Sequence, residues 1–178
     1  MKNILCLVLI IFIIICYPLT SSAQSDVKPI QISILDPVQI FDSDTSIHGI
    51  RLTLFYGTNQ DVVGLDWGGV VHELSGDMIG WQEGIVNLVE GDVKGFQDGF
   101  VNFVEGDFWG VQTGFVNINR SRTIGIQAGI NNSTNDMIGI QLGAVNITET
   151  LRGLQIGFIN INKSGKPIKF LPIVNISF

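Results

Sequence analysis

The chain has 178 residues, of which 46% are hydrophobic and only 15% are charged, and its formal net charge at pH 7 is −6. Its Lys and Arg residues form no cluster, which argues against a nucleic-acid partner because phosphate backbones are bound through basic patches. Both cysteines, Cys6 and Cys16, lie near the start, so the rest of the chain has no disulfide to stabilise it.

Residues 1–23 have the layout of a secretory signal peptide. Lys2 precedes an apolar run over residues 4–19, and small residues follow at Ser21 and Ala23, which together give a basic start, an apolar centre and a cleavage site. The run lies near the short end of what spans a bilayer, which disfavours an uncleaved anchor. We therefore expect cleavage after Ala23, export across a bacterial inner membrane, and a single domain over residues 24–178.

Two weakly alternating segments, residues 29–35 and 47–56, predict strands, and a repeat follows them. Its units read Gly-apolar-Gln-x-Gly-apolar-apolar-Asn with small variations, and they are spaced by sixteen, then fifteen three times, then fourteen residues twice. Internal repeats of this kind indicate arrays of one structural unit. The units begin at Gly64, Gly80, Gly95, Gly110, Gly125, Gly139 and Gly153.

Two amide positions recur in the repeat and are the candidates for a repetitive binding face. We expect the asparagines to bond backbone groups at strand ends, and the glutamines to form either a lumen lining or a buried polar ladder. The glutamines are Gln82, Gln97, Gln112, Gln127, Gln141 and Gln155, and the asparagines are Asn87, Asn102, Asn117, Asn146 and Asn160.

Within a unit the side chains alternate with a period of two, which is typical of strands and not of helices. This alternation puts Gln112 and Val116 on one face and Phe115 and Asn117 on the other. Turn residues such as Gly, Asp, Asn and Ser separate the units, and residues 170–178 supply a last strand. The sequence therefore predicts an all-β protein of about ten strands of roughly ten residues each.

The leading architecture is an antiparallel meander that closes into a small β-barrel. Strands that cross a membrane need about nine to eleven residues, and closure removes exposed edges. In this arrangement the apolar positions face lipid and the Gly and Gln positions face a narrow lumen.

The alternative is a parallel β-solenoid with about fifteen residues per coil, and two observations favour it. Glu83 and Asp98 fall mid-strand on the face assigned to lipid, where a charge costs roughly 2 kcal/mol or more. A repeat of one strand, in place of one hairpin, also lets equivalent residues stack, so that the glutamines form one ladder and the asparagines another.

The repeated Gly-apolar-Gln-x-Gly-apolar-Val-Asn motif, with a closing segment over residues 171–178, resembles bacterial surface-repeat proteins built from Gly-Leu-Gln-Ile-Gly-Leu-Val-Asn units. The similarity extends over about residues 47–178. It implies an exported, outer-membrane-associated protein of uncharacterised role. Glu83 and Asp98 depart from the apolar residues usual in that family, and the family supplies no active-site residues to transfer.

Few residues offer chemistry. His48 and His72 lie on separate predicted strands and in no recognisable motif, so we predict no enzyme, no catalytic residues, no cofactor and no metal. The acid pairs Glu90 and Asp92, and Glu105 and Asp107, offer oxygen ligands for calcium, but the repeat-type calcium motif is absent and solvated turns explain them better. The three tryptophans, Trp67, Trp81 and Trp109, fit an interfacial girdle and core positions equally well.

The functional expectation is a non-enzymatic, exported protein at the outer membrane or cell surface, with a structural or interaction role. The outer membrane is its expected partner, no protein partner is identified, and nucleic acid is excluded. Two alternatives stay open. One is a soluble secreted or periplasmic solenoid that binds a partner through its repeat face, and the other is a narrow pore for small solutes, which requires an open barrel.

Overall fold

The computed structural model describes residues 27–166 and 168–178. The signal peptide predicted at residues 1–23 lies outside this described part. Strands dominate it, in agreement with the all-β prediction. The strands are β1 (Val27–Leu35), β2 (Val38–Gln39), β3 (Ser46–Asn59), β4 (Val62–Gly68), β5 (Val71–Leu74), β6 (Met78–Glu83), β7 (Val86–Val89), β8 (Val93–Val104), β9 (Phe108–Leu142), β10 (Val145–Asn162) and β11 (Phe170–Ser177).

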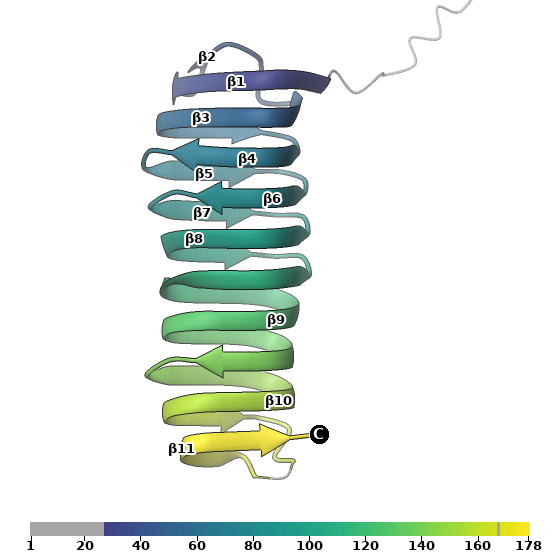
Figure 1. Ribbon diagram of the computed structural model, residues 1–178, viewed down its shortest axis with the longest axis vertical. Coiled ribbons are helices and arrows are strands. Elements are labelled where there is room, and N and C mark those ends of the chain that lie inside the picture. The colour runs from purple at the N-terminus through teal and green to yellow at the C-terminus, as the bar shows by residue number, and fades with distance from the viewer. Residues whose placement is uncertain (1–26, 167) are drawn as a thin grey trace, which may run out of the picture.

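Successive repeat units lie on top of one another as parallel coils. The strand order is β11-β10-β9-β8-β6-β4-β3-β1-β2, with β5 and β7 completing the same coils. Figure 1 shows the resulting stack, with β1 at one end of the long axis and β11 at the other. The chain is a β-solenoid of about nine turns with about fifteen residues per coil, so the solenoid alternative is confirmed and the antiparallel barrel is wrong.

The parallel register follows from the repeat itself. Gly95, Gln97 and Asn102 of β8 pair directly with Gly110, Gln112 and Asn117 of β9. One repeat length advances the chain by one coil, so every side chain meets its own equivalent. An amide that both donates and accepts is well suited to such a stack, because each copy bonds the next. In an antiparallel meander neighbouring strands run in opposite directions, so equivalent residues of successive units would not lie side by side along their length.

Each unit turns a corner near its second glycine, where the sequence predicted one straight strand. In the coil that contains β6 and β7 the corner separates the two strands, with a bend at Ile85, whereas β8 and β9 continue through their corners as unbroken strands. The bend changes the phase of alternation, so Gln112 and Asn117 are both fully buried although they are five residues apart. The predicted assignment of Asn117 to the face opposite Gln112 is therefore wrong.

The first glycine of each unit is required by a close approach of neighbouring coils. Gly110 has φ +138°, and a Cβ added there would fall far inside van der Waals contact of the Gly95 carbonyl oxygen in the preceding coil. A side chain would need both a left-handed backbone and a wider gap between coils. The recurring glycine therefore sets the stacking distance.

Replacing Gly110 with alanine is expected to lower the free energy of unfolding by about 3 kcal/mol, because backbone strain and a clash with an immovable carbonyl add. Urea denaturation followed by circular dichroism measures this. Gly165→Ala is the comparison, since Gly165 also has a positive φ but no atom lies within 4 Å of its added Cβ. We expect that variant to lose only about 1 kcal/mol, and equal losses at the two sites would contradict the role of coil contact.

A hydrophobic cluster fills one side of the coil interior in the N-terminal and central coils. It comprises Ile47, Val62, Leu74, Met78, Val89, Val93, Val104 and Phe108. At the C-terminal end, β11 runs antiparallel to β10, so the last coil does not continue the parallel stack. The ends of the rod thus differ from the repeats between them.

Candidate functional site

The glutamine positions form a buried ladder along the solenoid axis. All six predicted glutamines have no exposed surface. Gln112 Nε2 donates to Gln97 Oε1 over 2.6 Å, and Gln97 Nε2 donates to Gln82 Oε1 over 2.7 Å. The same bond links Gln127, Gln141 and Gln155 to the glutamine one coil earlier. These residues are interior, so the predicted repeat-face role does not fit their placement, and neither does a lumen lining.

The asparagine positions form a second ladder whose bonds run the other way. Asn87 Nδ2 donates to Asn102 Oδ1, and Asn102 Nδ2 donates to Asn117 Oδ1, each over 2.8 Å. Asn102 Nδ2 also donates to the Thr113 carbonyl at the corner, which agrees with the predicted bonds to backbone. The donors of this ladder point toward the C-terminus and those of the glutamine ladder toward the N-terminus, so the two rows of amide dipoles oppose each other. The remaining links join Asn117, Asn132, Asn146 and Asn160.

The glutamine ladder ends at its N-terminal side on a buried carboxylate. Gln82 Nε2 donates to Asp66 Oδ2 over 2.8 Å. Arg51 forms a bidentate pair with the same carboxylate through Nε and Nη2, both at 2.7 Å. His72 Nδ1 lies 2.8 Å from Asp66 Oδ1. An ionised carboxylate only accepts hydrogen bonds, so Asp66 fixes the direction in which every glutamine of the ladder donates.

The charge of Asp66 is maintained by its partners. Burial by itself raises the pKa of this carboxyl, but the Arg51 guanidinium and the His72 hydrogen bond outweigh burial and hold the pKa well below its usual range. All three side chains are fully buried. The cluster therefore has no contact with solvent, and its arrangement suits a structural ion pair at the end of a ladder.

The repeat pattern does not predict this cluster, although the sequence contains a signal for it. In the unit that begins at Gly64, Asp66 occupies the position of the repeat glutamine, and Arg51 lies fifteen residues earlier. Asn132, in the degenerate unit, is a further member of the asparagine ladder, and Asn175, which the repeat pattern groups with the asparagines, joins the glutamine ladder instead. Asn175 Nδ2 donates to Gln155 Oε1, because the antiparallel β11 places it on the glutamine row and not on the asparagine row.

The outer surface is the more unusual part of the molecule. Among the described residues, ten buried side chains are hydrophobic and 27 are polar or charged, whereas 29 large hydrophobic side chains are exposed. A folded soluble domain normally buries apolar side chains and shows few large apolar patches. This solenoid has the reverse distribution, because its amides bond one another inside and its apolar side chains point outward.

One corner of the coils carries a continuous line of apolar side chains, which we call the apolar edge. Phe100 and Phe115 stack there with ring centroids 4.8 Å apart, and Phe158 is 81% exposed. Beside this edge lies the second face, formed by the outward residues of the half-coil that follows it. The apolar edge comprises Ile85, Phe100, Phe115, Ile130, Ala144 and Phe158. The second face includes Val86, Leu88, Val101, Phe103, Val116, Ile118, Val145, Ile147, Ile159 and Ile161.

The first face, on the other side of the apolar edge, is apolar with charged interruptions. The indoles of Trp67 and Trp81 are about half exposed, and Trp81 packs edge-to-face against Phe96. Trp109 lies on the same face beneath the Lys94 ammonium. The tryptophans thus point outward and not into the core. Glu83 and Asp98 pair across neighbouring coils on this face.

The corner opposite the apolar edge holds most of the remaining charges, and we call it the charged edge. Asp107 N donates to Asp92 Oδ1, and Asp92 N donates to Asp77 Oδ1, each over 2.8 Å. The predicted acid turns are therefore a backbone-bonded ladder at coil corners. No group of His, Cys, Asp or Glu among the described residues has the arrangement of a metal site. The charged edge comprises Asp61, Asp77, Glu90, Asp92, Glu105, Asp107, Arg120, Arg122, Asp136, Glu149 and Lys163.

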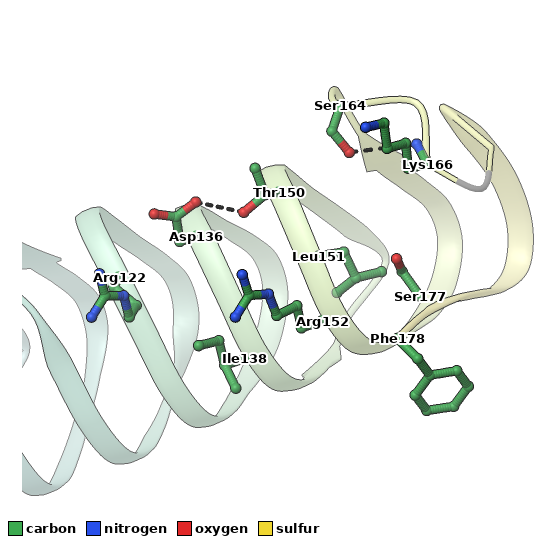
Figure 2. A pocket seen from close by; sticks show the side chains of 10 residues that line it. All are labelled: Arg122, Asp136, Ile138, Thr150, Leu151, Arg152, Ser164, Lys166, Ser177 and Phe178. Carbon is green, nitrogen blue, oxygen red and sulfur yellow. Dashed lines mark hydrogen bonds between the residues drawn. The ribbon is translucent and has the colours of Figure 1, made fainter.

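An open pocket of about 780 Å³ lies at the C-terminal end of the charged edge. Three cationic side chains line it, Arg122, Arg152 and Lys166, and we call them the cation cluster. The acidic side chain in the lining, Asp136, accepts a hydrogen bond from Thr150 (Figure 2). Arg122 lies 3.8 Å from Asp107. This end of the edge is therefore cationic, whereas the preceding coils are acidic.

The candidate histidines do not form a site together. His72 is fully buried against Asp66. His48 points outward in the row that contains Val63 and Ile79. The described part of the chain contains no helix long and apolar enough to cross a membrane.

Comparison with known proteins found no match to a family model, to a curated protein or to a solved structure.

Proposed function

We propose that this chain is an exported, non-enzymatic β-solenoid that associates with the outer membrane or cell surface, where it has a structural or interaction role. The observation that carries the proposal is the reversed polarity of the coils, with amide ladders inside and large apolar side chains outside. Extensive exposed apolar surface marks contact with a membrane or a partner. The signal-peptide layout of residues 1–23 and the resemblance to surface-repeat proteins support the same location.

The fold explains how such an exterior is compatible with a stable chain. The backbone groups of each coil bond the next coil, and the interior amides bond one another. Neither set of bonds requires the outer side chains to be buried. The exterior is therefore free to be selected for contact, and an apolar exterior needs an apolar environment.

Fractionation of bacteria that express the full chain tests this location. We expect the processed protein to pellet with outer membranes and to resist extraction by carbonate and by high salt, because apolar contact is not weakened by salt. Release in soluble form would contradict membrane association.

Soluble release would favour the second candidate, a secreted solenoid that binds a protein partner through its exterior. This candidate is favoured by Glu83 and Asp98, two like charges on neighbouring coils that interrupt the apolar surface of the first face. Charges within an otherwise apolar surface are typical of protein interfaces, where they help to choose the partner.

A further inference from the structure

We infer that the apolar edge and the second face lie in the hydrocarbon of one leaflet of a lipid bilayer, with the charged edge at the headgroup layer and the cation cluster against headgroup phosphates. This inference rests on the proposed function and adds to it an orientation, a depth and a lipid class.

The distribution of charge carries the orientation. The apolar edge and the second face occupy residues 85–89, 100–104, 115–119, 130–134, 144–148 and 158–162, and these segments contain no Asp, Glu, Lys or Arg. Charge borders them: Glu73 continues the row of Leu88 one coil earlier, and the Arg120 guanidinium lies over the Phe103 ring from the charged edge. The surface placed in hydrocarbon therefore begins at the coil of residues 85–89, and Asn131 is its exposed polar side chain. The first face carries Lys94, Arg152, Glu83 and Asp98. Burying a charge in hydrocarbon is costly. The solenoid avoids this cost if its second face enters the bilayer and its first face is tilted toward water.

The dimensions of a coil fit one leaflet. Phe100 on the apolar edge and Glu105 on the charged edge are five residues apart along an extended run, which spans about 16 Å at 3.3 Å per residue. Half of a bilayer's hydrocarbon is about 15 Å thick. A tilted coil of this width keeps the charged edge at the level of the headgroups while the apolar edge enters hydrocarbon above the midplane. The tilt keeps Glu83 and Asp98, two residues before the apolar edge on the first face, on the side that faces water.

The backbone also meets the requirement of this environment. Hydrocarbon supplies no hydrogen-bond partners, so a lipid-facing backbone must be satisfied internally. In β7, β8 and β9 the half-coils behind the second face pair in parallel with their neighbours on both sides. Their polar Asn side chains are turned inward and bonded in the asparagine ladder.

Charge complementarity selects an anionic lipid. Arg122, Arg152 and Lys166 line one pocket together with one carboxylate, Asp136. Arg122 also pairs with Asp107, so the three cations of the cluster face two carboxylates and keep an excess of positive charge. Figure 2 shows Arg122 and Arg152 projecting from the coil surface on the side of the pocket. Guanidinium groups bind phosphate with two parallel hydrogen bonds, so phosphate-bearing headgroups at this level fit the cluster.

A matched pair of labels on one coil tests the orientation. In the full chain with Cys6→Ser and Cys16→Ser, Phe100→Cys or Glu105→Cys receives an environment-sensitive dye. We expect the emission of the dye at residue 100 to shift to the blue when phosphatidylcholine vesicles with added phosphatidylglycerol are supplied, and the dye at residue 105 to keep a polar signal. Because the leader is the same in both proteins, it cannot produce a difference between them.

Other results with these labels overturn the inference. Pelleting with outer membranes together with a water-exposed label at residue 100 would reject the orientation while leaving the proposed location intact. A blue shift at residue 100 without lipid, accompanied by a dimer in sedimentation, would assign the second face to another copy of the chain.

The lipid class is tested by Arg122→Gln together with Arg152→Gln. We expect affinity for vesicles containing phosphatidylglycerol to fall roughly 10- to 30-fold, with binding to pure phosphatidylcholine unchanged and with Arg122→Lys and Arg152→Lys retaining the anionic preference. An equal loss on both vesicles would reject a headgroup contact. Stabilisation by inorganic phosphate in the absence of any vesicle effect would instead identify a free-anion site and overturn the lipid assignment.

Discussion

The Asp66→Ala variant is expected to lose about 3–5 kcal/mol of unfolding free energy, because it removes one partner of a fully buried ion pair and leaves the other unpaired. Arg51 Nε and Nη2, His72 Nδ1 and Gln82 Nε2 all direct hydrogen bonds at this carboxylate. Alanine leaves these donors without an acceptor in a site that solvent does not reach. Urea denaturation at neutral pH gives the measurement.

Two comparison variants separate the charge from a general loss of packing. Glu105→Ala removes an exposed acid from the charged edge and is expected to change stability by at most about 0.5 kcal/mol. Arg51→Met combined with Asp66→Leu removes both charges at once, so we expect it to be clearly more stable than Asp66→Ala alone. An Asp66→Ala protein within about 1 kcal/mol of the parent would show that the ladder does not depend on this carboxylate.

The pH dependence of stability gives an independent readout of the same group. The pKa of Asp66 is lower in the folded chain than in the unfolded chain. Its stabilising contribution is therefore complete above the unfolded value, near pH 4, and is lost as the pH falls toward the folded value. We expect the parent protein to lose stability in this acid range and Asp66→Asn, which cannot ionise, to lack that component.

The Gln112→Ala variant is expected to lose roughly 3–5 kcal/mol, because it interrupts the ladder in the middle of the rod. It leaves Gln127 Nε2 without the acceptor Gln112 Oε1 and deprives Gln97 Oε1 of its donor. Each buried polar group left without a partner costs about 1–3 kcal/mol, and the missing side chain also leaves a cavity. Chemical denaturation measures the loss.

The control for this variant is Gln60→Ala, at an exposed corner position where the amide faces water, and the expected change is within about 0.5 kcal/mol. Gln112→Met refills most of the volume without restoring the amide. If methionine recovers the full stability, then packing and not the hydrogen-bonded ladder holds the coils together. We expect it to recover the smaller part.

The two variants address different properties of one structure. Asp66 determines the direction of the glutamine ladder because it only accepts, whereas Gln112 transmits that direction from one coil to the next by accepting and donating at once. A chain of such amides polarises along its length. The asparagine ladder runs in the opposite direction, so its dipole partly cancels the dipole of the glutamine ladder along the axis of the solenoid.

Part of the candidate surface was visible in the sequence, and part was hidden by the corner at the second glycine. The alternation predicts that Phe115 lies on the same face as Asn117, because the two residues are two positions apart in the run. The corner between Gln112 and Asn117 breaks that alternation, so Phe115 reaches the apolar edge while Asn117 turns inward. A period of two holds only along a straight strand, and nothing local in a Gly-apolar-Val-Asn segment marks the bend.

The sequence by itself determined the repeat, its length near fifteen residues, the all-β class and the amide positions that bond their own equivalents. These properties follow from local alternation and from self-similarity, which are written along the chain. Only the tertiary structure decided that the coils stack in parallel and that the amides lie inside while Phe100, Phe115 and the valines of the second face lie outside. That decision depends on bonds between residues one coil apart, such as Gln97 with Gln112, and a buried amide satisfied by its neighbour has the same pattern in sequence as an exposed one.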